Sequence, residues 1–421
     1  MTSKSKNYSS AYVWIFLPKK VEPVVAGKLT FHGKSLIFNY GRSYLAREDA
    51  IAIYEPELPL TAGLLPLLPG MNMPSCIRDA SPDAWGRRVI INRQLSHEEK
   101  TSGIFELDEL TYLLESSSDR IGGLDFQLSA NNYEPRALTN VPLAELLEAA
   151  DRVDRGQLVS KELDQALNHG TSIGGARPKA LVEEKDKKYI AKFSSSTDLF
   201  SVVKAEFISM RLAKLCGLNV ASVSIVQSAN KDVLLIERFD RVKIKDGWQR
   251  RTMVSALTIL GLDEMMARYA SYENLSEIIR YRFLDASNTL RELFGRIVFN
   301  ILTGNTDDHA RNHAAFCDGK MLELTPAYDI CPQSRSGNES SQAMLIFKGN
   351  RMSQISVCLT SANNFLLSGK AAQSIVEHQI NTIKTHWQAV CEQAKLSESD
   401  QKLMWHRQFL NPFTLEGTLW A

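Results

Sequence analysis

From residue 171 onward the sequence places short strands first and helices afterwards. The stretch 180–193, A-L-V-E-E-K-D-K-K-Y-I-A-K-F, has two apolar runs around a charged turn, which predicts a β-hairpin. Residues 202–217 carry apolar residues at helical spacing and end at Gly217. Further strands are expected near 218–226 and 232–241, and from about 252 the pattern turns helical. Strands followed by helices predict an α+β, two-lobed fold.

The first 150 residues have a different pattern. Between residues 10 and about 60, short apolar runs are broken by Gly, Pro and Asn, with a turn expected at H-G-K, so this part is predicted to be β-rich. Helices are expected after Ser81-Pro82 and over 141–153. We therefore expect three parts: a β-rich N-terminal subdomain over 1–150, a small lobe over 151–245 and a helical lobe over 246–421.

Composition excludes some classes of protein and favours others. Lys and Arg number 49 against 48 Asp and Glu, so the net charge of +1 gives no global field that would attract nucleic acid. The six cysteines lie far apart without a C-x-x-C pair, which indicates reduced thiols in a cytosolic protein. No window approaches the ~18 apolar residues of a membrane span. A cytoplasmic protein without a membrane partner is expected.

Several residues that are weak signals alone occur in the order that phosphoryl transfer from ATP requires. A glycine-rich loop approaches the phosphates, a strand lysine neutralises them, and a carboxylate on the next helix fixes that lysine. A hinge strand, a base, an Asn ligand and a metal-binding Asp follow. In this chain the candidates are Gly174-Gly175, Lys192, Glu206, the strand L-L-I-E-R-F (234–239), Asp307, Asn312 and Asp329.

The stretch G-N-T-D-D-H-A-R-N (304–312) carries the chemistry in this interpretation. Asp307 and Asn312 are five residues apart, the spacing of base and metal ligand in a kinase catalytic loop. Apolar runs around Asp318-Gly319 predict a hairpin that returns Asp329 to the same region. Asp307 is thus the predicted base, and His309 is expected to hold the loop by hydrogen bonds. Asp308 is expected to serve loop structure or to contact substrate.

Other interpretations of these residues stay open. Asp307, His309 and His313 could hold zinc, although no H-E-x-x-H glutamate lies between the histidines. The same Asp and Asn pair would also serve a phosphotransferase for a small hydroxylated molecule. A purely structural origin of every motif, or a non-catalytic module that binds a partner or DNA, is the remaining alternative.

With these residues in place, the chain resembles the HipA family of toxin kinases over nearly its whole length. The similar motifs are S-I-G-G-A-R-P-K, A-E-F-I-S-M-R-L-A-K-L-C-G-L-N-V, E-R-F-D-R, T-D-D-H-A-R-N and L-T-P-A-Y-D-I. The resemblance implies a serine/threonine-protein kinase fold, ATP and Mg²⁺. It also implies toxin activity against translation through phosphorylation of an aminoacyl-tRNA synthetase. The implied partner is a small HipB-like helix-turn-helix antitoxin, so DNA would be bound only through that antitoxin.

The resemblance also assigns residues. It implies that Asp307 is catalytic, that Asn312 and Asp329 bind Mg²⁺, and that Ser172 is autophosphorylated as a form of self-inhibition. The implied nucleotide site comprises Ser172, Ile173, Gly174, Gly175, Ala176, Lys179, Lys192, Glu206, Glu237, Phe239, His309, Asn312 and Asp329. The sequence departs from the best-known member of the family at two places. Arg177-Pro178 replaces a Gln-Glu pair, and Asp308 replaces a glycine. These differences bear on the choice of substrate and on the mobility of the loop more than on the chemistry.

Overall fold

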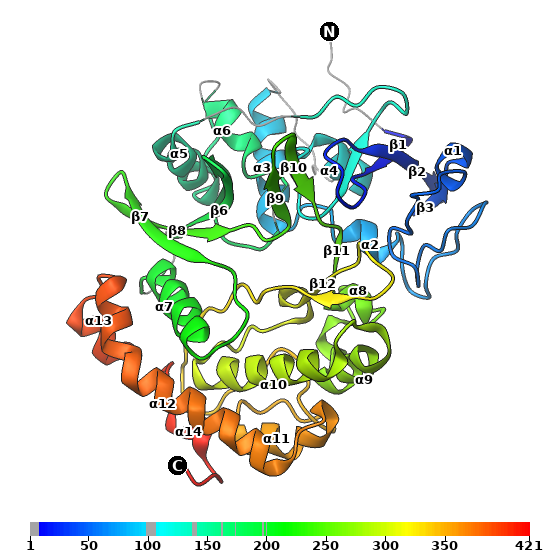
Figure 1. Ribbon diagram of the computed structural model, residues 1–421. Helices are drawn as coiled ribbons and strands as arrows, with labels where there is room; N and C mark the ends of the chain where they lie inside the picture. Colours follow the sequence, from blue (N-terminus) through cyan, green and yellow to red (C-terminus); the bar gives the residue numbers. More distant parts are fainter. Residues whose placement is uncertain are drawn as a thin grey trace. The chain divides into compact units, whose positions relative to one another are not determined.

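The computed structural model describes residues 8–97, 107–136, 141–160, 163–172, 174–195, 198 and 200–421. The chain forms two compact units (Figure 1). Unit 1 comprises Met1–Thr197, Val226–Val254 and Cys317–Gly319, and unit 2 comprises Asp198–Ile225, Ser255–Phe316 and Lys320–Ala421. The predicted division at residues 150 and 245 stays a prediction.

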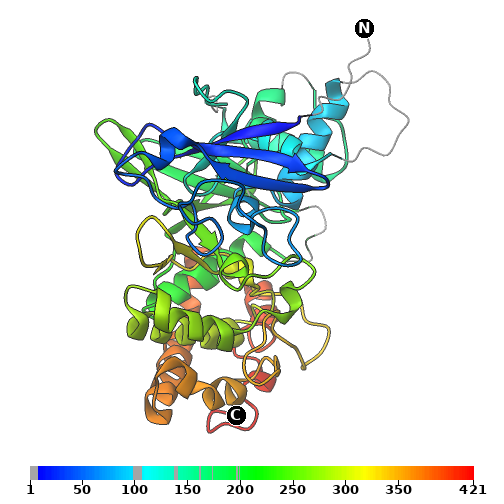
Figure 2. The ribbon, with the colours of Figure 1, turned by 90° about the vertical axis from the view of Figure 1, so that its right-hand side faces the viewer.

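The first sheet of unit 1 has four strands in the order β3-β2-β1-β4. The strands are β1 (Ser10–Ile15), β2 (Val24–His32), β3 (Ser35–Tyr40) and β4 (Leu124–Gln127), and each neighbouring pair is antiparallel. The three N-terminal strands are the blue ribbons of Figure 2. Between β2 and β3 the chain turns at Gly33, whose φ of +64° suits glycine. The predicted H-G-K turn is therefore confirmed.

The second sheet has the strand order β5-β6-β8-β7. Its strands are β5 (Lys179–Glu184), β6 (Lys187–Phe193), β7 (Val223–Ser228) and β8 (Lys231–Glu237). The predicted hairpin over 180–193 is β5 and β6, which pair antiparallel around a turn where Lys185 has φ of +54°. A further hairpin follows, formed by β9 (Arg241–Ile244) and β10 (Gly247–Arg250).

Helices complete unit 1. They are α1 (Arg42–Leu45), α2 (Ser75–Arg78), α3 (Ala84–His97), α4 (Glu109–Glu115), α5 (Leu143–Asp154) and α6 (Asp164–Asn168). Of these, α1 and α4 contact strands of the first sheet, and α5 contacts β5 of the second. The helix predicted over 141–153 is α5, which begins after Pro142. Its Leu146 and Ala150 share one apolar core with Ala191 and Val233 of the strands and with Trp85 of α3. Because such a core is closely packed, it holds β5, β6 and α3 in fixed positions relative to one another.

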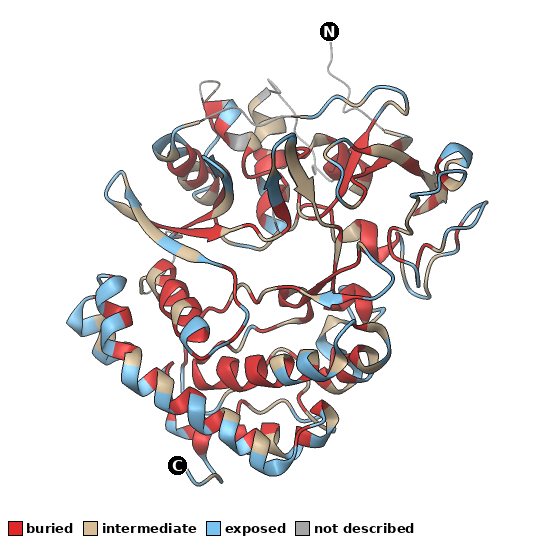
Figure 3. Cartoon of the chain, viewed as in Figure 1, coloured by how far each residue is buried: buried red, intermediate tan, exposed pale blue. Residues whose placement is uncertain are grey.

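Unit 2 is built around helix α10 (Ala286–Leu302), which is buried along most of its length (Figure 3). It contacts α9, α11 and α12, and α12 also packs against α7. The other helices are α7 (Val202–Leu215), α8 (Ala256–Ile259), η2 (Ala267–Tyr269), α9 (Tyr272–Arg282), η3 (Ala310–Asn312), α11 (Ile355–Thr360), η4 (Ala362–Phe365), α12 (Gly369–Gln393), α13 (Glu398–Met404) and α14 (Pro412–Leu415). Strand β11 (Met253–Ser255) lies at the boundary of the units, and β12 (Ala314–Phe316) pairs antiparallel with β13 (Glu323–Leu324).

The predicted α+β class is confirmed, since both four-stranded sheets lie before Arg241 and the chain from Ala256 onward is mainly helical. The hairpin predicted around Asp318-Gly319 is the β12–β13 pair. All six cysteines are free and buried. Among the described residues, no helix has both the length and the apolar character needed to span a membrane.

Candidate active site

The loop that carries Asp307 follows directly from the buried helix α10. At the end of that helix Gly304 adopts φ of +67°, and a Cβ atom there would lie 2.7 Å from the backbone oxygen of Gln408. Only glycine avoids both problems. The amide of Asn305 then donates to the Asn300 carbonyl at 2.9 Å. The loop therefore leaves α10 in one fixed direction.

Asp307 and Asn312 are joined inside this loop. The side-chain Nδ2 of Asn312 donates to the backbone oxygen of Asp307 at 3.1 Å. The backbone amide of His309 donates to the same oxygen at 2.8 Å, and the His309 carbonyl accepts from the Asn312 amide at 2.8 Å. The Asn312 bond uses the NH₂ end of its side chain, and its amide oxygen is the end that a hard cation would take.

Asp308, the neighbour of Asp307, anchors the loop inside unit 2. Its side chain is buried and accepts hydrogen bonds from the Tyr272 hydroxyl, from Asn300 Nδ2 at 2.7 Å and from His313 Nε2 at 3.0 Å. Burial acts to raise the pKa of Asp308, but His313 and Tyr272 outweigh it and hold that pKa below its usual value. This supports a role in loop structure.

The segment that carries Asp329 is held by two hydrogen bonds just before that residue. The Ala327 amide donates to the Asn219 carbonyl at 2.7 Å, and the Tyr328 hydroxyl donates to the Arg311 carbonyl at 2.7 Å. Asp329 itself has φ of +58°, a left-handed conformation that is uncommon for a residue other than glycine. Such conformations persist where the surrounding structure imposes them, often at functional sites.

Electrostatics show that these carboxylates act on one another. The Asp307 side chain is exposed, yet partial desolvation raises the pKa of its carboxyl group. His309 opposes this shift, and the negative charges of Asp329 and Asp308 add to it. Two neighbouring carboxylates and an amide oxygen are hard donors of the kind Mg²⁺ prefers. The donor atoms of Asp307, Asp329 and Asn312 are therefore of the chemical kind that suits a magnesium ion.

The zinc alternative is not supported by these contacts. The Nε2 atom of His313 contacts the buried Asp308 carboxylate. This nitrogen is therefore engaged by Asp308, which is not one of the predicted zinc ligands Asp307, His309 and His313. Within the part of the chain that the structure describes, no three His, Cys, Asp or Glu side chains form a group that could hold a metal ion.

Unit 1 contains the two predicted lysines as cross-strand neighbours. Lys179 on β5 and Lys192 on β6 are Cα partners, so their side chains share one face of the sheet. Both side chains are nearly buried, with 6% and 9% exposure. Two like charges held together at low exposure destabilise each other unless anionic groups compensate them.

The predicted glycine-rich loop also belongs to unit 1. Ser172 is 4% exposed, and its Oγ donates to the Asp119 carbonyl at 3.4 Å. The Lys179 Nζ donates to the Gly174 carbonyl at 2.5 Å. Ala176 is exposed. Ile173, also predicted for this site, lies outside the described residues.

The predicted hinge ends strand β8 and rests on a buried ion network. Glu237 pairs with Lys187 at the surface, with 2.6 Å between Nζ and Oε2. Next to it, Arg238 is buried and contacts Asp240 at 2.8 Å and Asp119 at 3.1 Å. Arg241 contacts the same two carboxylates at 2.9 Å each. The network fixes the backbone on both sides of Phe239.

The two arginines of this network differ in their electrostatics. Burial acts to lower the pKa of Arg238, but Asp240 and Asp119 outweigh it and raise that pKa. For Arg241, burial and the charge of Arg238 dominate, and the pKa falls to about 10. Both carboxylates are needed to hold the two guanidinium groups in this buried place.

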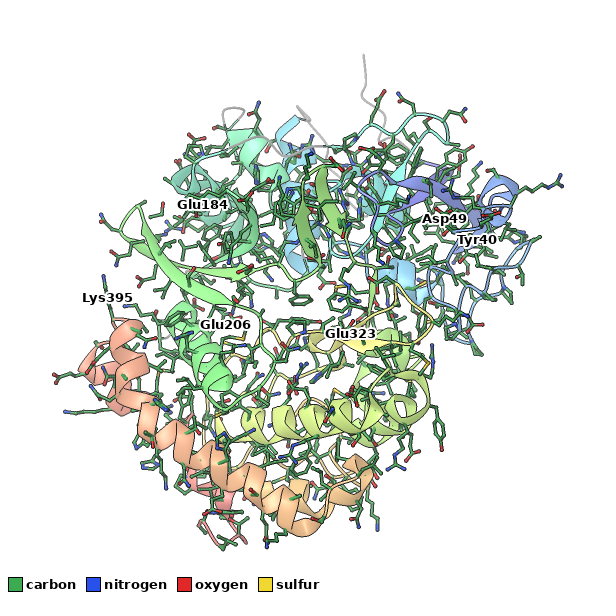
Figure 4. The ribbon with its side chains drawn as sticks, viewed as in Figure 1. Tyr40, Asp49, Glu184, Glu206, Glu323 and Lys395 are labelled. Carbon is green, nitrogen blue, oxygen red and sulfur yellow. The ribbon has the colours of Figure 1, made fainter. Side chains whose placement is uncertain are left out.

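Glu206 lies on α7, in unit 2 (Figure 4). It is 3% exposed, and a glutamate this buried is uncommon unless it is paired. Its predicted pairing with Lys192 of unit 1 stays a prediction. That the glycine-rich loop and Asp307 form one common site also stays a prediction.

Sequence reasoning missed the residues that position others. Asp119, Asp240 and Arg241 received no role, although E-R-F-D-R was singled out as a motif. Asp119 lies 119 positions before Arg238, and no local spacing relates the two. Asn300 and Tyr272 were missed for the same reason.

A comparison with known families decides the membership of the chain. A family profile described as HipA-like C-terminal domain matches residues 171–387, more than half of the sequence. This chain belongs to the HipA family. The matched region contains every predicted site residue from Ser172 to Asp329.

Curated relatives match part of the chain. The serine/threonine-protein kinase toxin HipA of Shewanella oneidensis is 30% identical over 183 residues, which are 38% of this chain and 42% of that protein. A putative kinase of Haemophilus influenzae is 29% identical over 182 residues, which are 38% of this chain and 52% of that protein. The chain therefore matches about half or less of the length of these relatives.

A solved structure shows the fold over a longer range. HipA of Shewanella oneidensis MR-1, in complex with HipB and operator DNA, matches with a TM-score of 0.67 at 19% identity. The match covers 94% of this chain and 95% of that one. The HipA-like fold is thereby confirmed for the N-terminal part as well as for the region of the family profile.

Proposed function

We propose that this chain is an ATP-dependent serine/threonine-protein kinase and the toxin of a HipBA-type toxin–antitoxin system. The observation that carries the proposal is the arrangement in unit 2. Asp307 has a raised pKa, Asp329 lies near enough to contribute to it, and Asn312 is hydrogen-bonded to the Asp307 backbone. Family membership supports the same assignment.

Each residue has a separate task in this proposal. Bound Mg-ATP supplies the phosphoryl group. Asp307 accepts the proton of the acceptor hydroxyl, for which a carboxyl pKa above its usual value is an advantage. Asn312 and Asp329 would hold the metal ion through oxygen atoms, and the ion would offset the negative charge of the phosphates. Lys179 and Lys192 neutralise phosphate oxygens, and Glu237 to Phe239 offer backbone groups to the adenine.

Substrate and partners are inferred from the family. The Shewanella structure contains HipA, HipB and operator DNA. We infer a HipB-like helix-turn-helix antitoxin as partner of this chain, with DNA bound through that antitoxin, in the cytoplasm. An aminoacyl-tRNA synthetase is the proposed substrate, and its phosphorylation would stop translation.

Ser172 is the proposed site of self-inhibition. Its side chain is 4% exposed and its hydroxyl donates to the Asp119 carbonyl, so we infer that a phosphate group on this oxygen would displace the loop. A phosphate adds about −1.5 to −2 charges at pH 7. Beside the phosphates of a nucleotide this charge would repel ATP, and Gly174 and Gly175 give the backbone the conformational freedom that loop opening requires.

One experiment tests the proposed function. The purified chain is incubated with Mg²⁺, ATP radiolabelled at the γ-phosphate and a nucleotide-depleted bacterial lysate. We expect label on serine or threonine of a lysate protein, and phosphate on Ser172 of the chain itself by mass spectrometry. Ser172→Ala is the control, which should keep labelling the lysate protein. Label confined to small molecules would instead establish the alternative phosphotransferase.

A further inference from the structure

The motif R-D-A-S-P-D-A-W-G (78–86) has no role in the proposed chemistry, yet it contacts the glycine-rich loop. The Oδ2 atom of Asp83 accepts a hydrogen bond from the backbone amide of Gly175 at 2.8 Å. Asp83 and Gly175 are 92 positions apart in the sequence and belong to the same unit. A carboxylate of the N-terminal region thus holds an amide of the loop.

Two further bonds tie the same segments together. The Trp85 amide donates to the Gly175 carbonyl at 3.0 Å, so both backbone polar groups of Gly175 are bonded to this motif. The Trp85 ring nitrogen donates to the Lys179 carbonyl at 2.9 Å. Loop and motif are therefore connected at both Gly175 and the first residue of β5.

Two glycines lie where the motif meets the loop. A Cβ atom on Gly174 would lie 2.6 Å from Asp83 Oδ2. Gly175 has φ of +93°, and a Cβ atom there would lie 2.2 Å from Lys179 Nζ. The two glycines thus permit the close approach of a carboxylate and a lysine to the loop backbone.

The support behind Asp83 is rigid. Asp83 directly precedes α3, and its carbonyl accepts from the Arg87 amide at 2.9 Å. Trp85 is 1% exposed within the core of unit 1, and Asn92 Nδ2 donates to the Gln157 carbonyl at 2.7 Å. A side chain on such a support fixes its partner more accurately than a flexible loop could.

We propose that Asp83 is a positioning residue for the glycine-rich loop. Its carboxylate sets the backbone of Gly174-Gly175 before the nucleotide arrives, which lowers the ordering cost of ATP binding. The inference rests on the proposed function for its effect on ATP. The contact itself can be measured without a nucleotide.

Hydrogen exchange of the peptide that contains Gly175 tests the contact. A hydrogen bond to a charged group contributes roughly tenfold or more in an equilibrium constant, so Asp83→Ala should accelerate exchange of this amide about tenfold. Asp83→Asn keeps an acceptor oxygen and should give an intermediate rate. It also provides a folded variant if Asp83→Ala is unstable.

Kinetics test the consequence. In Asp83→Ala the KM for ATP should rise about tenfold with a smaller change in kcat, because binding and not the proton transfer is affected. Asp49→Ala and Asp49→Asn are matched controls, since that carboxylate pairs with Arg47 at the surface of unit 1 (Figure 4). Both controls should exchange and react as the parent chain does.

Two results would overturn the inference. One is unchanged exchange of the Gly175 amide in both Asp83 variants. The other is faster exchange with an unchanged KM for ATP, which would make the contact merely structural. A parent chain that transfers no phosphate would reject the proposed function, and the exchange rates would still support or overturn the Asp83 contact.

Discussion

Asp307→Asn is expected to reduce phosphoryl transfer by about 10²- to 10⁴-fold, the range for loss of a general base. The carboxamide has nearly the same shape but cannot take the proton of the acceptor hydroxyl. The backbone oxygen of Asp307, which accepts from His309 and Asn312, is unchanged by this substitution. The loop should therefore keep its conformation, and ATP affinity should stay within a few-fold of the parent value. Transfer rates and ATP titrations on the same preparation check both statements.

The matched control is Asp318→Asn, which changes a carboxylate that pairs with Arg251 in unit 1. This variant should transfer phosphate at the parent rate. An Asp307→Asn chain that remains fully active would remove Asp307 from the role of base. Equal losses of transfer and of nucleotide affinity would instead indicate a disturbed site.

Asp240→Ala is expected to lower the free energy of unfolding by about 3–5 kcal/mol, the cost of removing one partner from a buried ion pair. Asp240 is 3% exposed and accepts from Arg238 Nε at 2.9 Å, from Arg241 Nη1 at 2.9 Å and from the Gly122 amide at 2.8 Å. Alanine would leave two buried guanidinium groups with Asp119 as the remaining carboxylate of this network. Urea unfolding of the parent and variant measures the difference.

The same residue predicts a dependence on pH. Burial acts to raise the pKa of Asp240, but Arg238 and Arg241 outweigh it and lower the pKa from 3.8 to about 2. Since the folded pKa is depressed, this stabilisation is fully present above pH 3.8 and is lost as the pH falls through about 2. Asp49→Ala, at an exposed ion pair, should unfold as the parent does. An Asp240→Ala chain of parental stability would show that the network is not stabilising.

The spacing of apolar residues and the turn residues between them predicted those helices and hairpins that form from residues close together in the sequence. The hairpin of β5 and β6 follows from two apolar runs around Lys185, and α5 follows from its apolar spacing after Pro142. The interval from Asp307 to Asn312 was informative because both lie in one loop. Family resemblance supplied the further roles, including that of Ser172.

Contacts between distant parts of the chain could not be predicted in this way. Asp83 meets Gly175 across 92 positions, and Asp119 meets Arg241 across 122. Such pairs depend on how whole elements pack, and no spacing rule relates them. For Asp308 the sequence alone could not decide between two roles. The sequence left loop structure and substrate contact open, and its burial against Tyr272 and Asn300 favours the first.

The central claim is that Asn312 and Asp329 hold Mg²⁺ beside the base Asp307. Calorimetric titration of ATP in Mg²⁺ and in EDTA tests it most directly, with the parent chain, Asn312→Ala and Asp329→Asn. We predict that Mg²⁺ tightens ATP binding to the parent chain and that both variants lose most of this gain, since Asn312→Ala removes an oxygen ligand and Asp329→Asn replaces a charged carboxylate by a neutral amide. Glu323→Gln, at an exposed glutamate of β13, is the control and should bind as the parent does. Equal affinity of the parent chain in Mg²⁺ and in EDTA, or an undiminished Mg²⁺ effect in Asp329→Asn, would contradict the account.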